Sequence, residues 1–442
     1  MKGLLDKLKP DAPQSEIQDT EQVKKTYKHW RVRTFYSIFI GYAFFYFTRK
    51  SFTFAMPAMI AELGFSKADL GLLATILYCS YGISKFVSGI VSDITNPRYF
   101  FSFGLIATGI CNILFGMSSS LWLFALFWGL NGWFQGFGWP PIAKYLTHWY
   151  SQSERGRWWA VWNTSHNIGG ALIPLIAGFC AYHWGWRMAM YVPGVLCILC
   201  GVFVWNRLRD TPQSMGLPPV AKYRQDEAES VQDTDSSLST SEILKKYIYK
   251  NPYLWLLGFA YFFVYVVRTA ANDWTVLYLV ESKGYTYFDA GKSITAFELG
   301  GFLGSLAAGW ISDVTFSGKR GPVNVLYALA TLLSVWGLWL VPANHVYLDI
   351  AIVFCIGFFV FGPQMLIGMA AAELAHKKSA GAATGFVGCF AYMGAAAAGY
   401  PLGRIIEDWE WYGFFAAVLI CCVLATLCLL PMWSLQKKKD KI

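Results

Sequence analysis

Charged residues are scarce in this chain. Asp, Glu, Lys and Arg make up 14% of its 442 residues, whereas a soluble domain usually has about 25%. The sequence also lacks a nucleotide-binding motif, a cluster of metal ligands and a nucleophile–base arrangement in a polar domain, so we expect neither an enzyme nor a cofactor. Residues 1–30 are polar and contain no short apolar segment of the kind found in a cleavable signal peptide.

A disulfide framework is not expected either. All ten cysteines lie in or at the ends of apolar runs. Cys197 and Cys200 form a CxxC pair, but they lie in the middle of an apolar run and no second pair is near. They are interpreted as packing residues, and no metal site is predicted.

Long apolar runs dominate the sequence instead. Hydrophobic residues make up 55% of the chain, and the mean hydropathy is +0.39. The runs recur at lengths of about 20 residues, which is what a membrane-spanning helix needs. Many of the 20 Trp and 25 Tyr residues lie at the ends of these runs, as expected for aromatic belts at a membrane surface. The composition predicts an all-α, multi-pass membrane protein.

The apolar runs predict twelve transmembrane helices. They cover 34–59, 68–92, 99–118, 121–147, 158–182 and 188–206, then 252–279, 289–313, 322–342, 347–373, 380–404 and 411–433. The polar, Ser-rich stretch between the halves is predicted to be a linker that ends in a short amphipathic helix. The expected parts are a cytoplasmic segment at 1–33, a six-helix bundle at 34–206, a cytoplasmic linker at 207–251, a second six-helix bundle at 252–433 and a basic tail at 434–442.

The net charge of +9 comes from basic residues in the predicted loops and termini. Most of them lie on one side of the predicted membrane, together with both termini and the linker. Since positive residues concentrate in cytoplasmic loops, topology explains the charge and no nucleic-acid partner is needed. We expect both termini to be cytoplasmic.

Two motifs recur at a constant distance along the chain. Gly64-x4-Asp69-x-Gly71 matches Gly284-x4-Asp289-x-Gly291, and GIVSD ending at Asp93 matches GWISD ending at Asp313, with every pair 220 positions apart. Such a parallel repeat indicates two pseudo-symmetric six-helix bundles, and it resembles the layout of the major facilitator superfamily. The run GIVSDITNPR also resembles that superfamily's cytoplasmic loop motif. The resemblance assigns Asp93, Arg98 and Asp313 to gating, not to substrate binding.

Two arginines lie inside apolar runs, where a permanent charge is costly. Arg49 is in GYAFFYFTRKSFTFAM and Arg268 is in GFAYFFVYVVRTAANDW, 219 positions later. A guanidinium at membrane depth costs at least ~2.5–3.5 kcal/mol on insertion scales. Arginine meets phosphate oxygens with a planar fork of donors. We therefore predict that Arg49 and Arg268, as equivalents in the two repeats, bind one phosphate dianion.

Other ionisable residues inside the predicted helices are functional candidates for the same reason. His166 and Lys85 are predicted to help bind the phosphate, whereas Lys50, Asp273 and Glu298 are predicted to balance charge or to gate. Purely structural roles remain open: Asp273 could pair with Arg268, Glu298 could be an inter-helix latch, and Lys50 could extend to the surface.

The organic part of a phosphate ester needs neutral donors and aromatic faces. The candidates for this side of the cavity are Tyr42, Tyr46, Trp139, Trp162, Asn163, Asn272, Gln364 and Tyr392. Two arginines in an empty cavity repel each other, and a bound phosphate cancels that charge. The bundles would then rock between two forms only when loaded, which predicts antiport.

Several runs together resemble the organophosphate:phosphate antiporter family over nearly the whole chain. They are FYFTRKSF, YGISKFVSGIVSD, QGFGWPP, WNTSHNIGGALIP, VYVVRTAANDW, FELGGFLGSLAAGW and FGPQMLIGMAAAE. The resemblance implies that Arg49 and Arg268 are the family's phosphate-binding arginines. It also aligns the family's helix 2 lysine, helix 5 histidine, helix 7 aspartate and helix 8 glutamate with Lys85, His166, Asp273 and Glu298.

The chain departs from this family pattern in helix 11. The bacterial hexose-phosphate carrier has an Asp and a Lys there, whereas FAYMGAAAAGYPL has Ala395 and Ala398. The receptor branch of the family is likewise uncharged at these positions. Two functions are therefore predicted: an antiporter of a sugar phosphate, with glucose 6-phosphate favoured, and inorganic phosphate, or a hexose-phosphate sensor that acts on a membrane histidine kinase. The resemblance implies a location in the bacterial inner membrane. We expect a monomer, because each pair of six-helix bundles encloses its own cavity.

Overall fold

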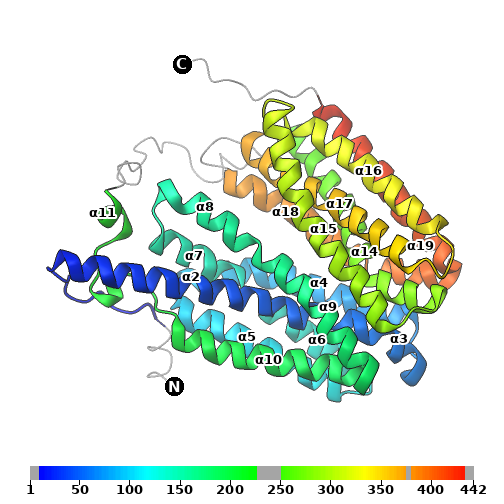
Figure 1. Cartoon of the computed structure of the whole chain (residues 1–442), viewed down its shortest axis with the longest axis horizontal. Helices are drawn as coiled ribbons and strands as arrows, with labels where there is room; N and C mark the ends of the chain where they lie inside the picture. The colour runs from blue at the N-terminus through cyan, green and yellow to red at the C-terminus, as the bar shows by residue number, and fades with distance from the viewer. Residues whose placement is uncertain (1–8, 226–249, 375–379, 434–442) are drawn as a thin grey trace. The chain divides into compact units, whose positions relative to one another are not determined.

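The computed structural model describes residues 9–225, 250–374 and 380–433, and these residues fold into helices (Figure 1). Those of the first half are α2 (Thr20–Lys50), α3 (Phe52–Leu63), α4 (Lys67–Ile94), α5 (Pro97–Met117), α6 (Leu121–Gln135), α7 (Trp139–Trp149), α8 (Gln152–Asn163), α9 (Ser165–Trp184) and α10 (Trp186–Arg207). The linker contributes η1 (Gln213–Met215) and α11 (Val220–Arg224). The second half has α14 (Pro252–Lys283), α15 (Tyr287–Val314), α16 (Arg320–Leu340), α17 (Val346–Leu374), α18 (Ala380–Ala397), α19 (Tyr400–Leu429) and η4 (Leu430–Met432).

The helices account for the twelve predicted spans. Among the described residues, eight segments are long and apolar enough to cross a membrane, by length and composition. One of them, Ala383–Met432, holds two spans, because the backbone leaves the helical conformation at Glu410 (φ 55°, ψ −154°). Three further spans are each made of two helices: α2 with α3, α6 with α7 and α8 with α9. The predicted all-α, twelve-helix architecture is confirmed.

The first helix begins earlier than predicted. Asp19 caps α2 by accepting a hydrogen bond from the backbone N–H of Glu21, so the helix starts at Thr20 and not near residue 34. Hydropathy could not place this start, because the first turns are polar on one face and bury Val23, Tyr27 and Trp30 on the other. The helix predicted at the end of the linker and the basic tail at 434–442 lie outside the described residues.

The repeated motif has the same local structure in both halves. Gly64 and Gly284 both have a left-handed backbone, with φ of 68° and 69°. Two residues later, Ser66 and Thr286 accept hydrogen bonds from the backbone N–H of Asp69 and Asp289, and exchange side-chain bonds with those carboxylates. This is a capping-box arrangement. The motif therefore starts α4 and α15 in the same way.

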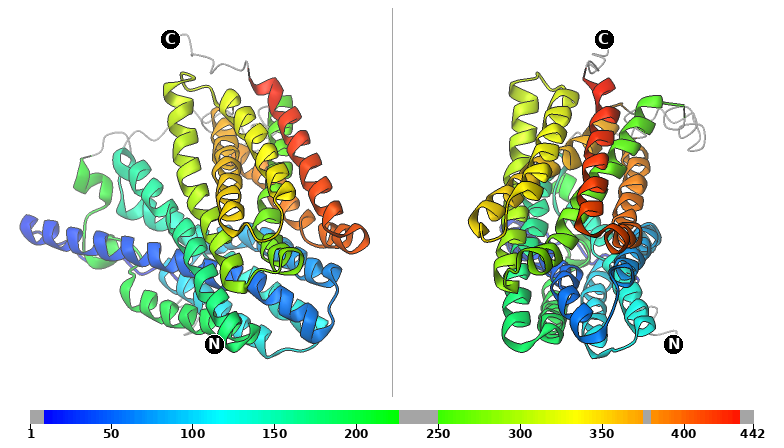
Figure 2. Two further views of the ribbon diagram at one scale, coloured as in Figure 1. Left: turned by 45° about the vertical axis from the view of Figure 1, so that its right-hand side comes forward. Right: turned by 90° about the vertical axis from the view of Figure 1, so that its right-hand side faces the viewer.

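Contacts divide the chain into two compact units. The first comprises Met1–Ser51, Ser80–Ile173 and Met190–Asp235, and the second Phe52–Cys79, Pro174–Ala189 and Ser236–Ile442. Helices α14 to α19 run alongside one another in the second unit (Figure 2). The cuts fall inside α4, α9 and α10, so one end of each packs with the C-terminal helices. The predicted bundle boundaries at 34–206 and 252–433 stay a prediction.

Candidate functional site

Three helices of the first half are interrupted beside candidate residues. The break between α2 and α3 follows Arg49 by two residues, that between α6 and α7 precedes Trp139, and that between α8 and α9 lies between Asn163 and His166. The second break has a local cause in the sequence Gly-Phe-Gly-Trp-Pro-Pro. Irregular backbone at membrane depth is tolerated where it lines a cavity or is buried in protein, and such breaks mark binding sites in transporters.

Arg49, at the end of α2, has a defined position in the first unit. Its Nε and Nη2 both donate to Oε1 of Gln135, at 3.2 and 3.0 Å. Its guanidinium also lies over the rings of Tyr46 and Tyr81, each 4.6 Å from the centroid. Aromatic faces stabilise a cation without cancelling its charge. These contacts fix the orientation of the guanidinium.

Gln135 is held in turn by a small polar network. Its Nε2 donates to Oγ1 of Thr48 at 3.0 Å and to Oδ1 of Asn131 at 3.2 Å, and Asn131 donates to the carbonyl of Thr48. All three side chains are buried. Sequence analysis missed Gln135 and Asn131. The signal that could have revealed them is two amides four positions apart in the apolar run LFWGLNGWFQ.

An aromatic cluster connects Arg49 with the other candidates of the first unit. Ring contacts run from Trp139 to Trp162 (5.0 Å), from Trp162 to Tyr42 (4.8 Å), from Tyr42 to Tyr46 (6.0 Å) and from Tyr46 to His166 (5.7 Å). Lys85 lies with its Nζ 5.4 Å from the Trp139 ring. The structure therefore gathers Arg49, Lys85, His166, Tyr42, Tyr46, Trp139 and Trp162 in one place.

Two candidates of the first unit are placed differently. Lys50 is buried, with 8% of its surface exposed, so it does not extend to the surface. Asn163 is an exposed residue at the end of α8, next to the buried Trp162. Trp162 Nε1 has no hydrogen-bond partner among the described residues. A buried indole N–H usually finds an acceptor, so this donor is available to a ligand.

Arg268 of α14 lies in an aromatic environment in the second unit. Its guanidinium is 4.6 Å from the ring centroid of Phe361 on α17 and 5.6 Å from that of Tyr265. Tyr265 also contacts the ring of Tyr392 on α18, at 6.2 Å. Like Arg49, Arg268 is an arginine placed over two aromatic faces in the middle of a helix bundle.

Gln364 of α17 is a further candidate in the second unit. The main-chain carbonyl of Gln364 accepts a hydrogen bond from Tyr261 at 2.9 Å. The side-chain oxygen of Gln364 is buried and has no hydrogen-bond partner within the described part of the chain. It could serve as an acceptor for a ligand hydroxyl.

Two buried polar contacts anchor α14. Asn272 donates to Oε1 of Glu298 on α15 at 2.9 Å, and both residues are at most 1% exposed. Asp273 accepts a hydrogen bond of 2.6 Å from the hydroxyl of Tyr78 on α4. Glu298 thus accepts from an amide of the neighbouring helix, and its role in charge balance or as an inter-helix latch stays a prediction. Asn272 was predicted on the sugar side, and that role stays a prediction.

One end of the first-half helices is closed against the C-terminal helices within the second unit. A Cβ at Gly71 of α4 would lie 2.6 Å from the carbonyl oxygen of Gly399, and one at Gly291 of α15 would lie 2.9 Å from that of Pro174 in α9. Gly71 and Gly291 occupy the same position in the repeated motif, and each lies close to a backbone carbonyl of the other half of the chain. Thr75 adds a hydrogen bond of 2.8 Å to the carbonyl of Ala396.

Ion pairs reinforce this closed end. Lys67 at the start of α4 pairs with Glu281 at the end of α14, at 2.9 Å, and lies over the ring of Trp411. Arg187 and Trp186 contact Glu62 of α3, at 3.7 and 2.9 Å. Both basic residues belong to the loops predicted to face away from the cytoplasm, so we call this region the outer seal.

The two copies of the predicted gating motif are held differently. Asp313 pairs with Arg320 at 2.6 Å, and Arg320 also pairs with Glu373 of α17 at 3.1 Å. Arg98 donates to the carbonyl of Trp205 at 2.7 Å. The side chain of Asp93 lies outside the described residues.

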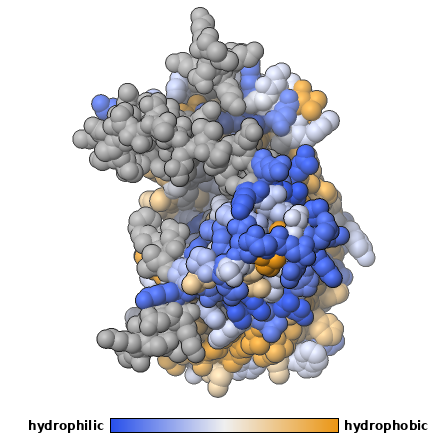
Figure 3. Space-filling view, turned by 90° about the vertical axis from the view of Figure 1, so that its left-hand side faces the viewer, coloured by the Kyte–Doolittle hydropathy of each residue, from blue (hydrophilic) through white to orange (hydrophobic). Residues whose placement is uncertain are grey.

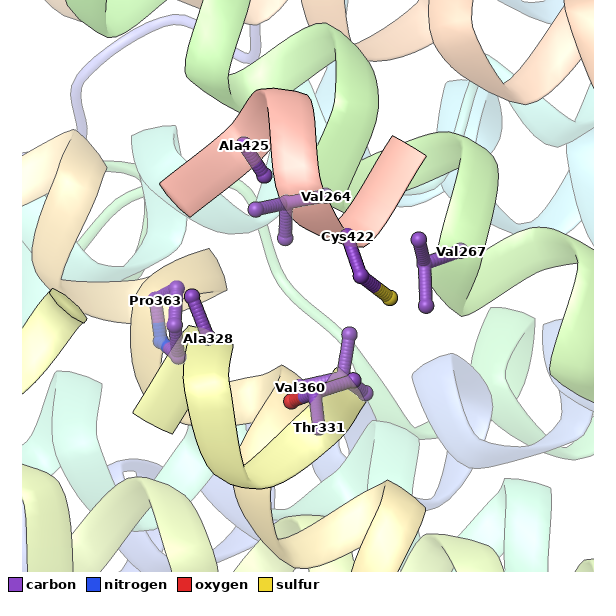
Figure 4. A pocket seen from close by; sticks show the side chains of 8 residues that line it. All are labelled: Val264, Val267, Ala328, Thr331, Val360, Pro363, Cys422 and Ala425. Carbon is purple, nitrogen blue, oxygen red and sulfur yellow. The ribbon is translucent and has the colours of Figure 1, made fainter. Parts of the chain in front are cut away.

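A small pocket in the second unit is too apolar for a charged ligand. Figure 4 shows its lining: Val264, Val267, Ala328, Thr331, Val360, Pro363, Cys422 and Ala425. Thr331 is the one polar side chain in this lining, and its hydroxyl already donates to the carbonyl of Tyr327 at 2.8 Å. The pocket is therefore a packing defect between helices and not a candidate site for phosphate.

Comparison with known proteins shows the family of the chain. A family model described as "Major Facilitator Superfamily" matches residues 38–400. The chain is 57% identical to the "Probable hexose phosphate transport protein" of Chlamydia trachomatis serovar D, over 96% of this chain and 95% of that one. It is 52% identical to the "Membrane sensor protein UhpC" of Escherichia coli, over 98% and 99% of the two chains.

A solved structure matches the fold. It is a bacterial homologue of the human lysosomal transporter Spinster in an inward-facing, unoccupied conformation, with a TM-score of 0.73 and 15% identity, covering 91% of this chain and 97% of that one. This likeness concerns the fold alone.

Proposed function

Because this chain belongs to the major facilitator superfamily, and within it to the organophosphate:phosphate antiporter family, we propose that it exchanges a sugar phosphate for inorganic phosphate by alternating access. A multi-pass membrane transporter, not an enzyme, is what family and fold indicate. The finer points are our proposal: antiport, glucose 6-phosphate as the favoured organic substrate, and a bacterial inner membrane with both termini in the cytoplasm.

The observation that carries the proposal is the environment of Arg49. An amide oxygen and two aromatic rings hold this guanidinium, and Lys85 and His166 belong to the same aromatic cluster. A guanidinium can meet phosphate oxygens with charge-assisted hydrogen bonds. We propose that Arg49 and Arg268 bind the phosphate, with Lys85 and His166 adding donors.

The sugar side is assigned to the neutral groups of the same regions. Trp162 and Gln364 each have a buried polar atom without a hydrogen-bond partner among the described residues. A site that pairs such atoms with ligand hydroxyls discriminates strongly against ligands that lack them. The remaining proposed contacts on this side are Tyr42, Tyr46, Trp139, Asn163, Asn272 and Tyr392.

Alternating access requires a reversible closure, and the outer seal supplies one. Its contacts are close backbone approaches and partly exposed ion pairs. Exposed pairs of this kind are worth little individually, so the seal can open without a large cost. Lys50, Asp273 and Glu298 are proposed to balance charge, and Asp93, Arg98 and Asp313 to gate the opposite, cytoplasmic end.

A sensor remains the second candidate function. The observation in its favour is the uncharged helix 11, in which Ala395 and Ala398 are 1% exposed, together with the identity to a membrane sensor protein. In this case the same residues would bind hexose phosphate, and a membrane histidine kinase would be the partner.

Phosphate counterflow in proteoliposomes separates the two functions. The purified chain is reconstituted with internal inorganic phosphate, and uptake of labelled phosphate is measured with and without external glucose 6-phosphate. Rapid exchange that glucose 6-phosphate drives supports the antiporter. Saturable binding of glucose 6-phosphate with no exchange would reject antiport and leave the sensor.

A further inference from the structure

Four arginines gather around the C-terminal end of α10 in the first unit. Arg33 belongs to α2, Arg98 to the first turn of α5, and Arg207 and Arg209 to the end of α10 and the residues after it. Arg33 and Arg209 lie over the same ring, that of Trp30, at 4.8 and 4.9 Å from its centroid. Two like charges on one indole are mutually repulsive unless something offsets them.

Backbone carbonyls bind the guanidinium groups of three of these arginines, whereas that of Arg207 lies over the ring of Phe203. Arg33 donates through Nε and Nη2 to the carbonyls of Arg207 and Asn206, Arg98 through Nε to that of Trp205, and Arg209 through Nη1 to those of Asn206 and Leu208. Capping the last turn of α10 is the structural part of their role. A guanidinium has five N–H donors, so each still has some to offer.

Asp11 acts on the charge of Arg209 but does not form an ion pair with the cluster within the described part of the chain. None of the four arginines forms an ion pair there, unlike Arg31, Arg224 and Arg320. Burial lowers the pKa of Arg209, and the nearby charges of Arg98 and Arg33 lower it further, with Asp11 acting in the opposite direction. The positive-inside rule explains why such residues occur in cytoplasmic loops, but it does not explain why their side chains lie close together.

An exposed apolar face of α10 extends along the helix to the arginine cluster. Along α10, Val195, Leu199, Val202 and Trp205 are 45 to 60% exposed, at helical spacing. Tyr99 of α5 contacts the ring of Trp205 at 5.6 Å, so α5 and α10 lie side by side (Figure 1). The end of the molecule at which α2 begins is hydrophilic with an apolar margin (Figure 3).

We propose that the four arginines form a binding site for the headgroup of an anionic phospholipid, whose acyl chains lie against α5 and α10. The phosphate would accept the remaining guanidinium donors, and Trp30 and Trp205 would lie at the level of the membrane interface. The exposed apolar face is the reason for choosing a lipid and not free phosphate, because a free anion would gain nothing from it. The site is separate from Arg49 and its cluster.

Native mass spectrometry of the full chain in detergent tests this site. The protein is mixed with equal amounts of phosphatidylglycerol and phosphatidylcholine of identical acyl chains, and the ratio of the first bound lipid is measured. We expect the wild type to prefer phosphatidylglycerol. In Arg33→Gln/Arg209→Gln, the ratio of bound phosphatidylglycerol to bound phosphatidylcholine should fall about fivefold for each arginine removed. Arg187→Gln/Arg404→Gln is the matched control, with the same change in net charge outside the cluster, and should keep the preference.

Three results would overturn the proposal: no preference in the wild type, an unchanged preference in Arg33→Gln/Arg209→Gln, or an equal loss in the control. A fourth arm adds millimolar inorganic phosphate. Displacement of the lipid by phosphate would show recognition of a free anion and would also reject the lipid. If the glutamine variant does not fold, Arg33→Lys/Arg209→Lys replaces it. Lysine lacks the planar fork, so the preference should fall, and an unaltered one would contradict the site.

Discussion

The position of Arg49 depends on a neutral partner. Gln135 accepts two hydrogen bonds from the guanidinium and is itself fixed by Thr48 and Asn131. A carboxylate in this place would orient the arginine equally well but would cancel its charge. The Gln135 amide orients the guanidinium without adding a negative charge of its own.

The first prediction concerns Gln135. We expect Gln135→Leu to weaken phosphate binding about tenfold, because hydrogen bonds to a charged group contribute ~1.5–3 kcal/mol. Gln135→Glu should weaken it more, since its carboxylate competes with phosphate for the same donors. Isothermal titration of the purified variants with phosphate measures both. Tighter binding by Gln135→Glu than by Gln135→Leu would contradict this role.

Part of the site could be predicted from residue types alone. Charge inside an apolar run identified Arg49, Arg268, Lys85 and His166, because burial of a charge is costly whatever the fold. The contact between Asn272 and Glu298 could not be predicted, since it depends on how α14 packs against α15.

The helix interruptions could not be predicted from hydropathy either. Hydropathy predicted single spans at 34–59, 121–147 and 158–182, because it averages over a window and cannot detect one or three non-helical residues. The structure breaks each of them. The Gly and Pro residues around 136–141 were a visible warning, whereas Ser51 and Thr164 carry no such signal.

The second prediction concerns the outer seal. Gly71→Leu places a side chain against the backbone of Gly399 and should separate α4 from the C-terminal helices. We expect faster amide hydrogen exchange at 67–79 and 396–403. Gly89→Leu is the control, since a Cβ at Gly89, in the same helix, meets nothing within 4 Å. Equal exchange in both variants would mean that Gly71 is not part of a closure.

The third prediction concerns the linker. Glu154 pairs with Arg31 of α2 at 2.6 Å and with Arg224 of α11 at 3.0 Å. Burial raises the pKa of this carboxyl, but the two arginines outweigh burial and hold the pKa below its usual range. A carboxyl with a lowered folded pKa stabilises the folded state above its unfolded pKa of about 4.3, and this contribution is lost as the pH falls through the folded pKa.

We therefore expect α11 to detach from α2 at acidic pH. Limited proteolysis within 207–225 should accelerate as the pH falls below about 4.3. Glu154→Gln should be cleaved faster already at pH 7 and show a flatter pH dependence. A Glu154→Gln variant with the pH profile of the wild type would assign the effect to another group.

At the scale of the whole molecule, each unit has one arginine over aromatic rings, Arg49 in the first and Arg268 in the second. They lie 219 positions apart, within one residue of the repeat distance, and that they bind one dianion together stays a prediction. The sequence predicted the twelve helices and the family. It could not decide between transport and sensing, because both functions use the same binding residues and differ only in the conformational change that binding permits.

The fourth prediction concerns that difference. Transport needs the loaded protein to reopen at the outer seal, whereas a sensor needs only to bind. We expect glucose 6-phosphate to raise amide exchange at 67–79 in the wild type, because antiport populates the outward-open form. Binding that leaves exchange at 67–79 unchanged would favour the sensor.

Exchange of labelled phosphate for glucose 6-phosphate in proteoliposomes that contain Arg49→Lys, Arg268→Lys or, as a control, Arg404→Lys is the most direct measurement. Because lysine keeps the charge but lacks the fork, we predict at least about a tenfold loss of exchange and of ligand affinity in each of the first two variants, and none in the control. Near-normal exchange in either Arg49→Lys or Arg268→Lys would contradict the proposal that this pair binds the phosphate.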